Sequence, residues 1–137
     1  MQLNEIVRRI PEFCASHWLI RIPLIVVFMQ QGLMKLPIDT ATAEAFGLTL
    51  VVWTFVVLGE IGGAIGLAAG GAMDYFSRLK PLGDLITRFS GITITCIMTG
   101  VIWLSDPYSF LDVLLYDNFH VLLWVGGMYF ALRGNRI

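Results

Sequence analysis

The chain has 137 residues, of which 57% are hydrophobic and 14% are charged, and its mean hydropathy is +0.77. Soluble domains carry about 25% charged residues, so the composition excludes an ordinary water-soluble domain and favours a membrane protein. The formal net charge of −1 provides no basic surface for a phosphate backbone, so no nucleic-acid partner is expected. Cys14 and Cys96 form no Cys-x-x-Cys motif, so neither a disulfide framework nor a metal site is expected.

Residues 1–16 have apolar side chains at helical spacing, with charged residues between them. This pattern predicts a short amphipathic helix lying on the cytoplasmic membrane surface. A frayed terminus is the alternative, and Pro11 would end the helix early. The apolar positions are Leu3, Ile6, Val7, Ile10 and Phe13.

Residues 17–137 contain four long apolar runs that end in aromatic, charged or turn-forming residues. Because the connections are short, consecutive spans should be antiparallel neighbours. The sequence therefore predicts an all-α fold, an integral membrane up-down four-helix bundle with the interfacial helix at its N-terminus. Ser109 and Asp112 resemble a capping box that opens the last span. The expected spans are 17–36, 48–70, 84–104 and 113–132.

Positive side chains flank these spans almost entirely on one side, which predicts the cytoplasmic side. Only Lys35 lies on the other side. We therefore expect a multi-pass protein of a bacterial inner membrane with both termini in the cytoplasm. A cleaved signal peptide ending at Ala41-Thr42-Ala43 is disfavoured, because the preceding span is long and interrupted by polar residues. The residues on the cytoplasmic side are Arg8, Arg9, Arg21, Arg78, Lys80, Arg88, Arg133 and Arg136.

The second span is rich in glycine at helical spacing. Glycines four residues apart form a groove that a neighbouring helix can approach closely, so this span should lie at the centre of the packing. The groove would accept either another helix of the same chain or a partner subunit. These residues are Gly59, Gly62, Gly63, Gly66 and Gly70. Matching small residues are Gly91, Thr95 and Thr99 on the third span and Gly127 and Ala131 on the fourth.

Glu60 is an ionisable residue within ~2 Å of the midpoint of the second span. Ionisable residues at this depth are costly and are candidates for function. Similar counting places Gln31 ~5 to 7 Å and His120 ~4 Å toward the outside, with Thr95 and Cys96 near the centre. Each predicted span thus contributes a polar group to one layer.

Three cations lie near this layer. Arg21 and Arg88 are ~9 Å inward of the centre, within reach of Glu60 if their helices face it. Lys35 is ~13 Å outward, so an ion pair with Glu60 should require water or Gln31 between them. Glu60 is therefore either a structural group that fixes helix register or part of a site for proton relay or ligand binding.

His120 has Tyr116 and Trp124 one helical turn away on each side. An imidazole between aromatic rings suits a quinone head group, which its ring nitrogen could hold by a hydrogen bond. Alternatively, His120 bonds a neighbouring helix and the aromatic residues anchor the membrane interface. A haem is not expected, since His17 lies ~19 Å away along the membrane normal. No covalently bound cofactor is expected.

Three segments carry a resemblance to a known family. The first span holds an Arg, a Phe and Gly-x-x-Lys-Leu, the second holds Leu-Gly-Glu-Ile-Gly-Gly, and the third opens with Thr-Arg. Together they resemble the DoxX-like family of small four-helix membrane proteins. One departure is the longer connection expected from Gly70 to Asp84. The matching residues are Arg21, Phe28, Gly32, Lys35, Leu36, Leu58 to Gly63, Gly66, Thr87 and Arg88.

The resemblance implies a link to membrane redox processes, and one branch of the family is a subunit of a thiosulfate:quinone oxidoreductase. We therefore expect a redox-associated subunit with a quinone or proton site at mid-membrane. The alternative is a non-catalytic accessory subunit of a larger respiratory or photosynthetic complex. In both cases the expected partners are the lipid bilayer and other membrane-protein subunits. The candidate site residues are Glu60, His120, Gln31, Arg88, Arg21 and Lys35.

Overall fold

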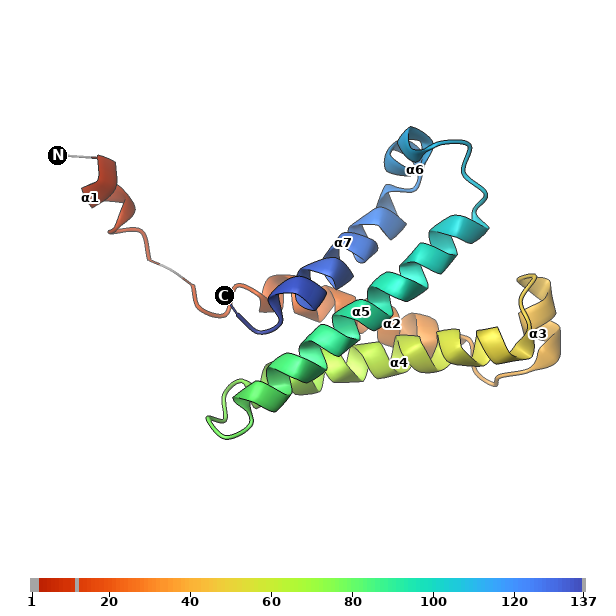
Figure 1. Ribbon diagram of the computed structural model, residues 1–137, viewed down its shortest axis with the longest axis horizontal. Coiled ribbons are helices and arrows are strands. Elements are labelled where there is room, and N and C mark those ends of the chain that lie inside the picture. The colour runs from red at the N-terminus through yellow and green to blue at the C-terminus, as the bar shows by residue number, and fades with distance from the viewer. Residues whose placement is uncertain (1–2, 12, 137) are drawn as a thin grey trace.

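The computed structural model describes residues 3–11 and 13–136, and this part of the chain is all-α, as predicted. Four long helices form the body of the protein (Figure 1). They are α2 (Trp18–Met34), α4 (Leu50–Met73), α5 (Lys80–Leu104) and α7 (Asn118–Arg133). The short helices are α1 (Leu3–Val7), α3 (Thr40–Ala45) and α6 (Phe110–Tyr116).

The four long helices follow the predicted up-down order. Helix α4 packs against α2 and α5, and α5 packs against α7. Neighbours are antiparallel, since Arg21 near the start of α2 donates a hydrogen bond to Leu67 near the end of α4. The apolar core between these helices consists of Leu24, Phe28, Ala64, Leu67, Ile94, Met98, Leu123 and Phe130.

Glycines allow α4 and α5 to approach closely. A Cβ at Gly59 would lie 2.8 Å from Ile97, and one at Gly66 or Gly70 would collide with the side chain of Ser90 or Thr87. Gly63 also faces α5, where a Cβ would lie 3.2 Å from Ile94. Gly62 differs from the prediction, because no atom lies within 4 Å of its Cβ position.

The small-residue stripe on α5 faces α7 rather than α4. A Cβ at Gly91 would collide with the backbone N of Ala131 and lie 2.6 Å from the carbonyl oxygen of Gly127. On the same face, Trp124 Nε1 donates a 2.9 Å hydrogen bond to Thr99. The centre of the packing is therefore shared by α4 and α5, because each contacts a long helix on both sides.

The connection between α4 and α5 is shorter than expected. Helix α4 continues to Met73 and α5 begins at Lys80, so only residues 74–79 join them. Pro81 does not delay α5, because it lies in the first turn, where a backbone N–H has no helical partner. Most residues from Gly70 to Asp84, where a long connection between spans was predicted, are thus helical.

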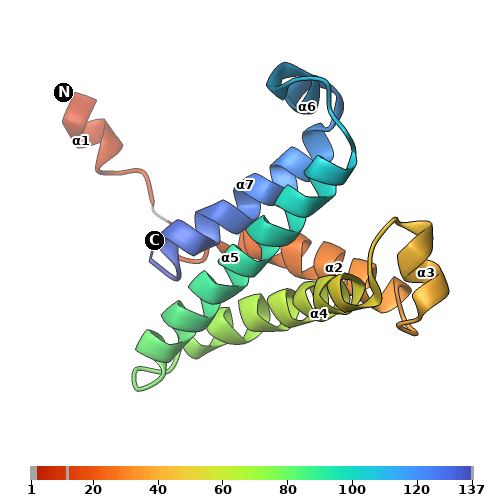
Figure 2. The same ribbon diagram turned by 45° about the vertical axis from the view of Figure 1, so that its right-hand side comes forward.

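The predicted fourth span is wrong as a single helix, because it breaks at Asp117. Ser109 caps α6 as the sequence indicates, accepting a 3.2 Å hydrogen bond from the backbone N of Asp112. Helix α6 then ends, and α7 starts in a new direction (Figures 1 and 2). Asp117 and Asn118 disfavour a helix interior, since their side chains compete for backbone groups.

The N-terminal helix is also shorter than predicted. Helix α1 ends at Val7, and Figure 1 shows it apart from the body. Ile10 and Phe13 lie beyond it and are exposed. A continuous amphipathic helix through Phe13 is therefore wrong, since Pro11 restricts the preceding residue to non-helical conformations.

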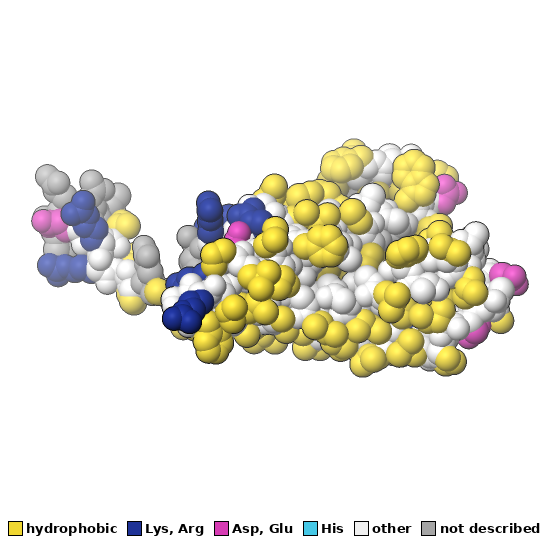
Figure 3. All heavy atoms as spheres, turned by 60° about the horizontal axis from the view of Figure 1, so that its bottom comes forward, with side chains coloured by type: hydrophobic (Ala, Val, Ile, Leu, Met, Phe, Trp, Pro, Cys, Tyr) yellow, Lys and Arg dark blue, Asp and Glu magenta, His cyan; other side chains and the backbone are white. Residues whose placement is uncertain are grey.

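Two helices, α4 and α5, are long and apolar enough to cross a membrane, and α2 is a shorter apolar helix. Much of the outward surface is hydrophobic, including Phe55, Phe89 and Leu122. In Figure 3 hydrophobic side chains cover the length of the body. Basic side chains gather at the end that carries the C-terminus, where Asp84 also lies, and other acidic side chains lie at the opposite end.

Candidate functional site

A cavity of about 960 Å³ lies between the ends of the long helices that are farthest from the C-terminus. Its walls come from α2, α4, α5 and α7, and from the segment between α3 and α4. Most of the lining is apolar, with Phe28, Trp53 and Met98 among its residues. Polar side chains interrupt this lining, namely Gln31, Lys35, Glu60, Cys96, Thr99, Ser105 and His120.

Lys35 and Glu60 form an ion pair in the cavity wall. Lys35 Nζ lies 2.8 Å from each carboxylate oxygen of Glu60. Glu60 is almost completely buried, with 3% of its side chain exposed, and Lys35 is 18% exposed. The ammonium group also donates a 3.3 Å hydrogen bond to the carbonyl oxygen of Gln31 and lies 6.0 Å from the centre of the Trp53 ring. The pair therefore has two charges that a ligand in the cavity could contact.

The direct ion pair contradicts the expectation that water or Gln31 must bridge it. Helix α2 lies against α4 with Gly32 level with Glu60, since a Cβ at Gly32 would be 3.3 Å from the Glu60 Cβ. Lys35 follows Gly32 by only three residues, a rise of about 4.5 Å, which its side chain spans easily. The depth estimate failed because it aligned the midpoints of the two helices and gave the lysine side chain no length.

His120 also lines the cavity, from the first turn of α7. Its Nδ1 lies 2.5 Å from an oxygen of Asp117, the residue at the helix break. The expected aromatic pair does not flank it, because Tyr116 belongs to α6 and is 82% exposed. Trp124 is bonded instead to Thr99 on α5.

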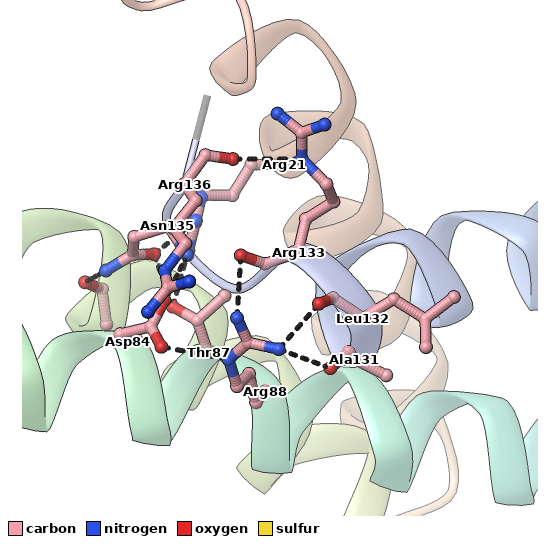
Figure 4. Close-up of polar contacts among 10 residues, drawn as sticks. Arg21, Asp84, Thr87, Arg88, Ala131, Leu132, Arg133, Asn135 and Arg136 are labelled. Atoms are coloured by element: carbon pink, nitrogen blue, oxygen red, sulfur yellow. Dashed lines mark hydrogen bonds and ion pairs between the residues drawn. The ribbon is translucent and has the colours of Figure 1, made fainter.

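The two predicted arginines lie at the opposite end of the body and do not reach Glu60. Arg21 is fully buried, and its guanidinium donates to the carbonyl oxygen of Leu67 at 2.6 Å. It also donates to Thr87 at 3.2 Å and to Asn135 at 2.8 Å (Figure 4). The guanidinium carbon also lies 4.5 Å from the centre of the Phe130 ring. Arg21 therefore joins α2, α4, α5 and the C-terminal segment.

Arg88 secures the end of α7. Its Nε lies 2.8 Å from Asp84, and its other nitrogens donate to the carbonyl oxygens of Ala131, Leu132 and Arg133 (Figure 4). These carbonyls have no helical partner, so a cation there is favourable. Both arginines thus have structural contacts, and the prediction that they line the cavity with Glu60 is not supported by their positions.

Helix α3 packs beside Trp53, one of the residues that line the cavity. Asp39 caps it, accepting hydrogen bonds from the backbone N and the hydroxyl of Thr42 at 2.7 and 2.9 Å. These bonds lower the pKa of Asp39, because they stabilise the carboxylate. Ala43 of the same helix is buried against Trp53 and Val57. The cap therefore stabilises the short helix that packs against Trp53.

Three residues that make contacts at the two ends of the body were not identified from the sequence. Trp53 looked like one of many apolar residues of its span, and Asp117 like an exterior loop residue. Asn135 lies beyond the last apolar run, where no periodicity signals a contact. The polar interruption Asp117-Asn118 in an apolar run was the one available signal for the helix break.

Among residues 3–11 and 13–136, no three His, Cys, Asp or Glu side chains converge as metal ligands. Comparison of the chain with protein-family models, curated proteins and solved structures finds no match.

Proposed function

We propose that the chain is an integral protein of a bacterial inner membrane, which it crosses with α2, α4, α5 and α7. The apolar length of α4 and α5 supports this placement, as do the exposed hydrophobic side chains along the body. The basic end would lie in the cytoplasm with both termini, following the positive-inside rule. Helix α1 would then lie on the cytoplasmic membrane surface.

The orientation can be tested with the exposed native Cys14. In a Cys96→Ser background, a membrane-impermeant maleimide should label Cys14 in inside-out vesicles but not in intact spheroplasts. Ser109→Cys, at the opposite end and in a Cys14→Ser/Cys96→Ser background, should give the reverse pattern. Labelling of Cys14 from outside the spheroplasts would overturn the proposed orientation.

We propose further that the cavity binds the head group of a quinone and that the protein is a redox-associated membrane subunit. One observation carries this proposal: the Lys35–Glu60 ion pair and His120 line the same mostly apolar cavity. The apolar walls can enclose a ring and its tail, while Lys35 and His120 can donate hydrogen bonds to carbonyl oxygens. Glu60 and His120 are also groups that can hold or release a proton.

The contacts also bear on the DoxX-like resemblance, which remains a proposal. The Gly-x-x-Lys-Leu and Glu-x-Gly-Gly segments meet in the Lys35–Glu60 pair. The arginine of the first segment meets the Thr-Arg segment through the hydrogen bond from Arg21 to Thr87. The resembling residues thus make contacts with one another, which is what a shared structural framework would require.

Quinone binding can be measured by quenching of tryptophan fluorescence, since Trp53 and Trp103 line the cavity. We expect a short-tailed ubiquinone analogue to quench the purified protein saturably. Glu60→Gln and His120→Gln should each weaken binding by about tenfold, the cost of one charged hydrogen bond. Saturable quenching that is equal in wild type and both variants would refute the site.

Two adjacent glutamines provide a matched control. Gln31 lines the cavity, whereas Gln30 is exposed on another face of α2, among residues of a shallow apolar hollow. Gln31→Leu should therefore alter quinone affinity, and Gln30→Leu should not. Equal effects of the two substitutions would show that the response is not specific to the cavity.

The accessory-subunit alternative is favoured by one feature, the position of α6. No residue of this helix is buried, and Phe110, Leu111 and Leu115 are all exposed. Helix α6 projects from the body in both ribbon views (Figures 1 and 2). If the protein purifies in mild detergent within a large complex, and deletion of 110–116 releases it, the accessory role gains support. Purification as a free, quinone-binding protein would count against it.

A further inference from the structure

Asp117 occupies an unusual position relative to the cavity. It ends α6 and precedes α7, so it lies at a break within an apolar run. Its carboxylate contacts Nδ1 of His120, whose side chain is 34% exposed in the cavity wall. A residue that interrupts a helix thus also holds the one cavity-lining imidazole.

His120 is the only side-chain hydrogen-bond partner of Asp117 in the described part of the chain. The second carboxylate oxygen of Asp117 is buried without a partner among those residues. Because a carboxylate only accepts hydrogen bonds, it retains the proton on Nδ1 and leaves Nε2 as the nitrogen that changes its protonation. His120 makes no other hydrogen bond in that part of the structure, so Nε2 is free to bond a ligand.

We propose that Asp117 is a positioning residue that makes His120 a pH-dependent selector between the two redox forms of the bound quinone. The proposal rests on the quinone site proposed above. In the imidazolium form, Nε2–H donates to the carbonyl oxygen of an oxidised quinone. In the neutral form, Nε2 accepts the hydroxyl proton of a quinol in a hydrogen bond. No electron transfer is required for this selection.

The geometry also favours a ligand with two opposed oxygens. One acid–base pair, Lys35 and Glu60, comes from α2 and α4, and the other, Asp117 and His120, comes from the α6–α7 junction. Lys35, Glu60 and His120 line one cavity, and Asp117 contacts it only through His120. A para-quinone has carbonyl oxygens on opposite edges of its ring, so each pair can bond one of them. A lipid with a single polar group could satisfy only one pair.

The direction of the pH effect follows from these two forms. Imidazole changes charge between about pH 5 and 8, and lower pH favours the imidazolium. The oxidised quinone should therefore bind more tightly at low pH and the quinol at high pH. The other titratable groups that line the cavity are Lys35, Glu60 and Cys96. Lys35 and Glu60 are paired with each other, and His120→Gln leaves this pair in place. Comparing the variant with the wild type therefore isolates the contribution of the imidazole to the pH effect.

The experiment measures the affinities of oxidised and reduced decylubiquinone by tryptophan quenching, anaerobically, between about pH 5.5 and 8. For the wild type, we expect the ratio of quinone to quinol affinity to fall by about tenfold over this range. His120→Gln should make the ratio independent of pH. Asp117→Asn should leave binding measurable but flatten the ratio, because a neutral amide no longer holds the proton on Nδ1 as the carboxylate does.

Asp112→Asn is the matched control, since it removes an equal charge nearby at a residue that neither lines the cavity nor bonds His120. It should retain the wild-type ratio at every pH. If Asp117→Asn also retains that ratio while the wild type binds, the positioning role is wrong and the quinone site stands. If the wild type binds neither form, both proposals fail. Should Asp117→Asn not fold, a pH-independent ratio in the wild type, or an unchanged pH-dependent ratio in His120→Gln, would still overturn the inference.

Discussion

The two ends of the body use polar residues in different ways. At the C-terminal end, Arg21 is fully buried, and hydrogen bonds join it to the backbone of α4, to Thr87 and to Asn135. At the other end, Lys35 and Glu60 are paired beside a cavity of about 960 Å³. The first arrangement encloses its polar groups between helices, whereas the second leaves them accessible to a ligand.

This difference follows from how the helices approach one another. Near the C-terminal end, Gly70, Gly83 and Gly91 allow backbone contact between α4, α5 and α7. Toward the cavity, Gly100 of α5 has no atom within 4 Å of its Cβ position. At Gly100, which lines the cavity, α5 thus has open space beside it, whereas at the C-terminal end its glycines meet backbone. The predictions below test this division.

Replacing Arg21 with Leu should have the largest effect on stability. The change would remove the side-chain donor to the carbonyl oxygen of Leu67 and one of the two donors to Asn135, whose other donor is Thr87, and it would weaken the link of α2 to α4 and α5. We expect a loss of about 3–5 kcal/mol in the free energy of unfolding, as when one partner of a buried charged network is removed. Unfolding by SDS titration, followed by circular dichroism, measures this loss.

Arg133→Leu is the control for Arg21→Leu. Arg133 is exposed, and its one side-chain hydrogen bond in the described structure goes to the carbonyl oxygen of Arg136, so we expect less than about 0.5 kcal/mol of change. Similar losses for both variants would mean that the buried cluster does not hold this end together.

A pair of glycines on α5 tests the packing difference directly. Gly91→Ala places a Cβ against the backbone of Ala131 and Gly127, which cannot move aside, and should cost about 3 kcal/mol. Gly100→Ala meets open space and should stabilise the helix by about 0.5–1 kcal/mol. The same SDS titration compares them, and a destabilising Gly100→Ala would show that α5 is packed along its whole length.

Much of the helical architecture could be predicted, because long apolar runs and glycine spacing are local features of the sequence. The packing of Gly59, Gly63, Gly66 and Gly70 against a neighbour follows from such spacing. Gly62 belongs to the same pattern yet faces no neighbour. Two glycine stripes overlap on this helix, and spacing alone does not predict which of them packs against a neighbour. That depends on where the partner helix crosses.

The candidate site was harder to predict, because it depends on the offset between helices. Glu60, Gln31, Lys35 and His120 could be selected by residue type and depth, and all four line the cavity. Depth placed both arginines on the inward side of the centre, but the assumed reach of their side chains kept them in the predicted site. Arg21 has a partner, Asn135, 114 residues away in the sequence, and no local pattern indicates such a contact.

At the cavity end, Lys35→Met should destabilise the protein less than Arg21→Leu and Gly91→Ala do. It leaves Glu60 buried without its cation, but the carboxyl can take up a proton, which limits the cost to about 1–2 kcal/mol. The double variant Lys35→Met/Glu60→Gln should recover most of that loss, since neither charge remains. A double variant no more stable than Lys35→Met would show that the pair is not the source of the cost.

The smallest effect concerns α3, the short helix that packs against Trp53 near the cavity. Hydrogen bonds from Thr42 lower the pKa of Asp39 below its ordinary 3.8, so its cap contributes stability above that pH and loses it as the pH falls through the lowered value. Amide exchange of Thr42, measured from about pH 6 to 3 and corrected for intrinsic rates, should therefore show protection decreasing at the acid end. Asp39→Asn keeps an acceptor without a titrating charge, so its protection should not change with pH. A parallel decrease in this variant would assign the acid effect to another group, because the amide cap cannot titrate.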